Sequence, residues 1–104
     1  VNGERHTTSL VLGAAGSVSD WGVSRFDALN EQHFAGLIKE GEPVPELVIL
    51  GSGLRLRFVP PSLLRPLIER RIGVETMDTG AACRTFNILA GEGRRVVAAL
   101  LIEA

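Results

Sequence analysis

"RRVVAALLI", residues 94–102, decides how this sequence folds. After two arginines, the run 96–102 consists of apolar residues only. Side chains of a β-strand point alternately to the two faces of its sheet, so an unbroken apolar run is typical of a strand that is covered on both sides. We therefore predict a central strand here, with further layers packed on both of its faces.

The segments before this strand alternate between strand and helix patterns. "ELVILGSG" (46–53) is a short continuous apolar strand, "VETM" (74–77) predicts a second strand, and residues 79–91 predict a helix. Between the two strands, "PPSLLRPLIERRIG" (60–73) has helical spacing, with Pro66 expected in the first turn. Its inward-facing side chains would be Leu64, Leu67, Ile68 and Ile72. Residues 47–102 therefore predict a β-α-β-α-β segment.

The first half of the chain is richer in strand patterns. "TTSLVLGAAG" (7–16) predicts a strand that ends at the glycines of residues 13–16, and "SVSDWGVSRF" (17–26) predicts a second short strand or an irregular loop. "LNEQHFAGLIKEG" (29–41) predicts a helix with Asn30 as its cap and Gly41 as its stop. The fold class is accordingly α/β to α+β, a single three-layer domain over residues 1–104 around a central mixed β-sheet. Because the chain starts at Val1 without a Met, we expect a trimmed N-terminus.

Composition excludes several function classes. A net charge of −1 over 104 residues argues against a nucleic-acid-binding surface, although residues 1–50 sum to −4 and residues 51–104 to +3. The single Cys excludes an intramolecular disulfide and fits a reducing compartment, so we expect a cytoplasmic location. The sequence has no apolar run of the length that spans a membrane and no visible signal peptide.

Two motifs resemble cofactor and metal sites without completing them. Gly51, Ser52 and Gly53 follow a strand, but the third glycine of the dinucleotide fingerprint is replaced by Leu56, which favours a tight turn. His6 and His33 are far apart and have no Cys or carboxylate at ligand spacing. We therefore expect neither a cofactor nor a metal.

The helix predicted over residues 79–91 contains the main candidates for a catalytic or binding role. Cys83 is a weak catalytic candidate near the helix N-terminus, where backbone amides favour a thiolate, but no His lies nearby in the sequence and a structural role is favoured. Gly80, Arg84, Asn87 and Gly91 form a narrow polar strip, while Ala81 and Ile88 extend the apolar face. The strip would line a cleft, meet a partner, or pair internally with an acid such as Asp78 or Glu92, and we favour internal pairing.

With these motifs in place, the sequence resembles a known family. The run "VETMDTGAACRTFNILAGEGRRVVAALL", with "ELVILGSG" and a proline-led helix before it, is similar to the family called domain of unknown function 498, whose mitochondrial relatives include complex I assembly factor 3. The family motif matches at these residues: Asp78, Thr79, Arg84, Thr85, Asn87, Glu92 and Arg94. The resemblance implies a three-layer domain around a mixed sheet, without known catalytic activity. For bacterial members it implies a role in membrane-protein biogenesis.

Two functional hypotheses follow. The leading one is a non-enzymatic interaction or assembly protein that binds a protein partner, associates peripherally with membrane complexes and binds no nucleic acid. Its contact surface would include these residues: Gly51, Ser52, Gly53, Asp78, Thr79, Arg84, Asn87, Glu92 and Arg94. The alternative is a small-anion-binding protein or enzyme that uses a crevice between loops 51–53 and 78–80, with Cys83 or Asp78 as the reactive group.

Overall fold

Strand β5 (Val96–Leu100) occupies the middle of a five-stranded sheet with the order β2-β1-β5-β3-β4. The computed structural model describes residues 8–13, 17–38 and 44–103. The other strands are β1 (Leu10–Leu12), β2 (Val18–Asp20), β3 (Leu47–Gly51) and β4 (Gly73–Met77). The predicted central position of the last strand is confirmed, and residues 17–26 do contain a short strand.

The sheet is mixed, as predicted. β3 pairs in parallel with β4 and with β5, while β1 pairs antiparallel with β5 and with β2. Gly51 lies opposite Met77 on one side and Leu100 on the other, so β3, β4 and β5 all finish at the same end of the sheet. We call this the carboxyl end of the sheet. It is the place where open α/β sheets bind their ligands.

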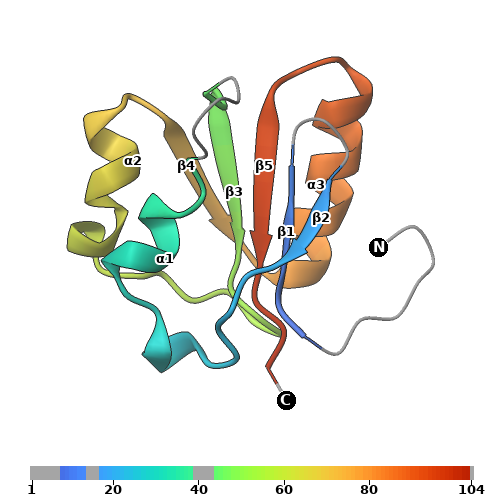
Figure 1. Ribbon diagram of the computed structural model, residues 1–104. Helices are drawn as coiled ribbons and strands as arrows, with labels where there is room; N and C mark the ends of the chain where they lie inside the picture. Colours follow the sequence, from blue (N-terminus) through green and yellow to red (C-terminus); the bar gives the residue numbers. More distant parts are fainter. Residues whose placement is uncertain (1–7, 14–16, 39–43, 104) are drawn as a thin grey trace.

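Helices cover both faces and complete the three predicted layers (Figure 1). The α-helices are α1 (Glu31–Ala35), α2 (Arg65–Glu69) and α3 (Thr79–Gly91), and the short 3-10 helices η1 (Phe26–Ala28) and η2 (Pro61–Leu64) precede α1 and α2. α3 packs on one face, and α1 and α2 pack on the other. Pro66 lies in the first turn of α2, as predicted.

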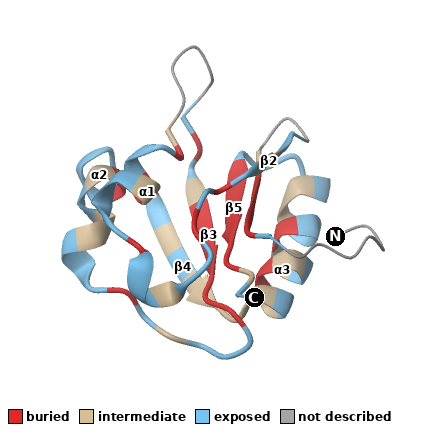
Figure 2. Ribbon diagram, turned by 60° about the horizontal axis from the view of Figure 1, so that its bottom comes forward, coloured by how far each residue is buried: buried red, intermediate tan, exposed pale blue. Residues whose placement is uncertain are grey.

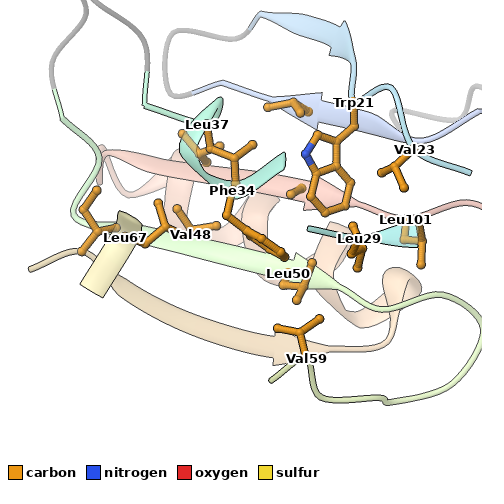
Figure 3. Close-up of a cluster of buried hydrophobic side chains, with 14 residues drawn as sticks. Trp21, Val23, Leu29, Phe34, Leu37, Val48, Leu50, Val59, Leu67 and Leu101 are labelled. Carbon is orange, nitrogen blue, oxygen red and sulfur yellow. The ribbon is translucent and has the colours of Figure 1, made fainter. Parts of the chain in front are cut away.

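Alternate residues of β5, together with Leu101, which follows it, enter the two apolar cores. Val97, Ala99 and Leu101 face the α1 and α2 side, where Trp21 and Phe34 pack edge to face with ring centroids 5.8 Å apart (Figure 3). Val96, Ala98 and Leu100 face α3 and contact the cluster of Ala82 and Phe86. Figure 2 shows the central strands as the most buried part of the sheet. An unbroken apolar strand is thus required because both of its faces are covered.

Two helix predictions need correction. The helix that follows Asn30 is capped by this residue as predicted, but it ends at Ala35 with Gly36 as C-cap, and Gly41 lies outside the described residues. In α2, Leu67 and Ile72 are buried as predicted, whereas Ile68 is 55% exposed. A helix of five residues offers room for little more than one buried position per turn, so Ile68 turns toward water.

Candidate functional site

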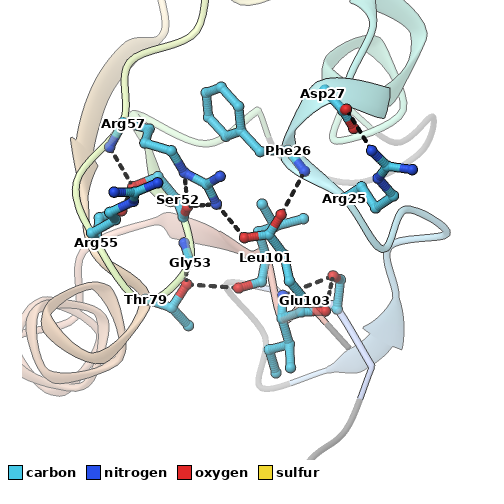
Figure 4. A network of polar contacts seen from close by, with 12 residues as sticks. Arg25, Phe26, Asp27, Ser52, Gly53, Arg55, Arg57, Thr79, Leu101 and Glu103 are labelled. Atoms are coloured by element: carbon cyan, nitrogen blue, oxygen red, sulfur yellow. Dashed lines mark hydrogen bonds and ion pairs between the residues drawn. The ribbon is translucent and has the colours of Figure 1, made fainter.

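The carboxyl end of the sheet is held together by Thr79, the first residue of α3 (Figure 4). The amide of Gly53 donates to Thr79 Oγ1 at 2.9 Å, and the amide of Thr79 donates to the Gly53 carbonyl, also at 2.9 Å. Thr79 Oγ1 in turn donates to the carbonyl of Leu101 at 2.7 Å. One hydroxyl therefore joins the loop after β3, the start of α3 and the segment after β5.

The two glycines of the 51–53 turn are required by this close approach. A Cβ at Gly51 would lie 3.0 Å from both Cα and Oγ1 of Thr79, and Gly53 has a φ of +105°. A Cβ at Gly53 would also lie 2.6 Å from the guanidinium of Arg57. Glycine is the residue that adopts such a conformation at low cost. These contacts agree with the interpretation of the motif as a tight turn.

Ser52, between the glycines, is fully buried and organises the loop that follows it. Its Oγ accepts a hydrogen bond from the amide of Arg57 at 2.9 Å. The same hydroxyl lies 2.9 Å from the carbonyl oxygen of Arg55 and 3.2 Å from that of Met77, and it can donate to either. A single buried side chain thus fixes the path of residues 52–57 across the end of the sheet.

Arg57 connects this loop to Glu103, the last described residue of the chain. Its Nη2 donates to the Ser52 carbonyl at 2.8 Å and forms an ion pair with Glu103, while its guanidinium lies 4.4 Å from the ring centroid of Phe26. Glu103 also accepts from the Phe26 amide at 3.0 Å. These two hydrogen bonds, first that from Phe26 and then that from Arg57, lower the pKa of the Glu103 carboxyl.

Three amides at the start of α3 donate to groups of this chain. Asp78 is the N-cap, and its Oδ1 accepts from the Ala81 amide at 2.9 Å. The amide of Thr79 donates to Gly53, and the amide of Ala82 donates to the Asp78 carbonyl. An anion at the crevice of loops 51–53 and 78–80 would have to compete with these internal hydrogen bonds.

Cys83 is half-buried on α3 and packs beside the Ala82 and Phe86 cluster. Burial is the main influence on this residue and raises the pKa of its thiol, while the neighbouring Arg84 acts in the opposite direction. A raised pKa keeps the group protonated at neutral pH, whereas a nucleophile needs the thiolate. The environment therefore resembles that of a structural cysteine.

Arg84 and Asn87 are exposed on the outer surface of α3. Among residues 8–13, 17–38 and 44–103, no carboxylate forms an ion pair with Arg84, so the favoured internal pairing with Asp78 or Glu92 is not found. Ile88, which the helix projection assigned to the apolar side, is 62% exposed beside them. The reason is that α3 packs on β3 and β5 through one side only, which leaves a wider outer face than the projection predicts.

The remaining predicted residues lie elsewhere. Glu92 caps the C-terminus of α3, and Arg94 pairs with Glu46 at 3.1 Å near the start of β3, at the opposite end of the sheet. The predicted set is thus divided between the carboxyl end, the outer face of α3 and the opposite end of the sheet.

Two features of the carboxyl end were not predicted from the sequence. One is the Arg57–Glu103 pair, whose members are too far apart in the chain for any local signal. The other is the run of Leu54, Leu56 and Phe58, which are exposed on the loop that Ser52 and Arg57 fix. The alternating "LRLRF" pattern of residues 54–58 was the available signal for this second feature.

A hollow of about 300 Å³ adjoins the carboxyl end, lined by Thr8, Ser9, Asp20, Gly22, Val23, Ser24 and Ile102. Asp20 is the charged member of this lining, so the hollow offers an anion no positive charge. Within the described ranges no three His, Cys, Asp or Glu side chains gather into a metal-binding group. His33 instead serves the capping box of α1, where its Nδ1 accepts from the Asn30 amide at 3.0 Å.

Comparison with known proteins places this architecture in a family. The family model described as "Protein of unknown function (DUF498/DUF598)" matches residues 1–101. The chain belongs to the DUF498/DUF598 family. Among solved structures, a Bordetella parapertussis protein superposes with a TM-score of 0.85 at 38% identity, covering 95% of this chain and 82% of that chain. A Bordetella pertussis protein described as a Mth938-like domain gives a TM-score of 0.76 at 36% identity, covering 93% and 75%.

Curated relatives of this DUF498/DUF598 member are named for an assembly role. A Bos taurus protein named NADH dehydrogenase [ubiquinone] 1 alpha subcomplex assembly factor 3 is 41% identical over 85 residues, which are 82% of this chain and 46% of the relative. The human protein of the same name is 39% identical over 85 residues, with the same coverage. The chain thus spans about half the length of these relatives. The resemblance noted in the sequence is confirmed at the level of the family.

Proposed function

We propose that this protein is a non-enzymatic assembly factor that binds a subunit of the NADH dehydrogenase complex through the outer face of α3. The observation that carries the proposal is the exposure of Arg84, Asn87 and Ile88 on this face, where Arg84 has no ion pair to another described residue. The names of the relatives support the choice of NADH dehydrogenase as the partner complex.

The three side chains suit a protein contact. Arg84 and Ile88 are four residues apart on the helix and therefore neighbours on its surface, with Asn87 beside them. Arginine provides several donors in a fixed plane, the amide of Asn87 both donates and accepts, and Ile88 supplies apolar area. Arg is also enriched at the residues that contribute most to interface affinity. Gly80 and Gly91 at the two ends of the face leave room for a partner to approach.

The chemistry of the carboxyl end supports binding over catalysis. Its polar groups are engaged in holding the loops together, and the thiol of Cys83 is half-buried with a raised pKa. No observation favours the alternative of a small-anion site over a protein contact. The predicted cytoplasmic location stays a prediction, and no helix in the described part of the chain has the length and apolar character to cross a membrane.

The proposal is tested by replacing the host gene with variants and measuring assembled NADH dehydrogenase complex on native gels, together with NADH oxidation by isolated membranes. Arg84→Glu reverses the charge of the proposed contact and should deplete the assembled complex. Arg95→Glu is the matched control, because Arg95 is also exposed but lies just before β5, at the opposite end of the sheet. Thermal unfolding of both purified variants checks that the fold is kept.

Normal complex levels in the folded Arg84→Glu variant would contradict the proposed surface. Equal depletion by Arg84→Glu and Arg95→Glu would also contradict it, because a general charge effect would then suffice. If Arg84→Glu unfolds the domain, the residue has a structural role, and Ile88→Asp provides the second test of the same face.

A further inference from the structure

The loop after β3 exposes an unusual amount of apolar surface. In the segment 54–58, which we call the arm, Leu54 is 103% exposed, Phe58 71% and Leu56 51%. Single exposed apolar residues are common in soluble proteins, but three within five consecutive residues form a patch that indicates a binding surface. None of these residues belongs to the α3 face proposed above.

The arm is fixed at its base. The Ser52 hydroxyl accepts from the Arg57 amide, and the Arg57 guanidinium is turned inward onto the Ser52 carbonyl, Glu103 and the Phe26 ring (Figure 4). Because the Arg57 side chain points inward, the side chains of its neighbours Leu56 and Phe58 remain exposed to solvent. A loop that is already ordered loses less conformational entropy on binding, so its apolar side chains are available for an external contact at low cost.

Positive charge accompanies the apolar side chains. The arm itself contains two arginines and no acidic residue, and one of them, Arg57, is paired with Glu103. Arg55 is exposed between Leu54 and Leu56, and no ion pair joins it to a carboxylate of the described residues. The arm leads through η2 into α2, whose first residue, Arg65, is exposed as well, whereas Arg70 lies just before β4 at the opposite end of the sheet.

We propose that the arm inserts into the interfacial region of an anionic lipid bilayer. Leu54, Leu56 and Phe58 would enter the boundary between head groups and acyl chains, while Arg55 would pair with lipid phosphates. Exposed apolar side chains with a basic residue beside them suit a bilayer interface, because binding there scales with the buried apolar area and with the attraction of basic residues to anionic lipids. The positive charge of Arg55, which no carboxylate of the described residues pairs, complements an anionic leaflet.

Co-sedimentation with lipid vesicles tests the proposal on the full chain. Vesicles of phosphatidylcholine and phosphatidylglycerol in equal parts should bind the protein, those of phosphatidylcholine alone should bind it much less, and added salt should weaken the binding. Leu54→Ser and Phe58→Ser should each lower the affinity for the mixed vesicles by about tenfold. Arg55→Gln should lower it less, by about threefold to tenfold.

Matched controls separate the arm from general surface effects. Val18→Ser removes an apolar side chain that is 54% exposed at the end of β2 away from the arm, and Arg95→Gln removes one positive charge just before β5. Both controls should bind the mixed vesicles like the unaltered protein. Phe58→Trp adds a direct reporter, because its emission should shift to the blue and be quenched by brominated acyl chains, whereas Trp21 is buried in the core.

Three results would overturn the proposal. The first is that the mixed vesicles leave the protein in solution, the second is that the arm variants bind as well as the two controls, and the third is that the vesicles do not change the emission of Phe58→Trp. Loss of a protein contact by the arm variants, without any vesicle binding, would assign the arm to a protein partner instead. The outcome is independent of the Arg84→Glu experiment, which concerns a different face and a different measurement.

Discussion

Replacing Thr79 by Val removes one hydroxyl and keeps the shape of the side chain. The Gly53 amide then loses its acceptor and the Leu101 carbonyl loses its donor, at the place where three segments of the chain meet. Gly53 and Leu101 are both buried, so water cannot easily replace the missing partner. The backbone hydrogen bond from Thr79 to Gly53 remains in the variant, which confines the change to the hydroxyl.

The expected cost follows from these two contacts. A hydrogen bond contributes about 1 kcal/mol net, and a buried donor left without a partner costs about 1–3 kcal/mol. We therefore expect Thr79→Val to lower the free energy of unfolding by about 2–4 kcal/mol, with a fall in Tm of roughly 10–20 °C for a domain of this size. Urea unfolding followed by the fluorescence of Trp21 measures this difference, because Trp21 is the single Trp and is buried in the core.

Two further variants make this measurement decisive. Thr85→Val changes the same atoms on the same helix, where the hydroxyl makes no hydrogen bond to any described residue, and it should cost less than about 1 kcal/mol. Thr79→Ser keeps the hydroxyl and should recover most of the lost stability. The reasoning is refuted if Thr79→Val is no more destabilising than Thr85→Val, because the hydroxyl would then not hold the carboxyl end together.

Two predictions concern titratable groups. Since the folded state lowers the pKa of Glu103, this carboxylate stabilises the protein above the ordinary Glu pKa of about 4.3, and the contribution is lost as the pH falls through the lower folded-state value. Urea unfolding over a range of pH should therefore show that the free energies of unfolding of the unaltered protein and of Glu103→Gln become more similar in acid. A difference that stays constant with pH would contradict a lowered pKa for Glu103. Since burial raises the pKa of Cys83, iodoacetamide should label it more slowly at neutral pH than a free thiol, with the rate rising in alkali. Rapid neutral labelling would restore Cys83 as a reactive candidate.

The sequence alone determined the elements whose signals are local. The apolar run after Arg95 specifies β5 because a strand covered on both faces accepts no polar side chain. The bounds of α3 also follow from neighbouring residues, since Asp78 caps its first turn and the glycines end its last one. Asn30 marks the start of α1 in the same way. Such signals act within one helical turn or one strand, so they do not depend on how the rest of the chain is packed.

Only the tertiary structure decided which distant groups meet and which surfaces stay uncovered. Thr79 reaches Gly53 and Leu101 because the parallel strands β3, β4 and β5 finish side by side, a result of the strand order that no local pattern records. Helical spacing identifies the apolar side of a helix, but the exposure of Ile68 and Ile88 depends on how much of that side the sheet covers. For the same reason the surroundings of Arg84 could be judged only after α3 was packed on its face of the sheet, because a side chain's partners depend on its neighbours in space rather than in sequence.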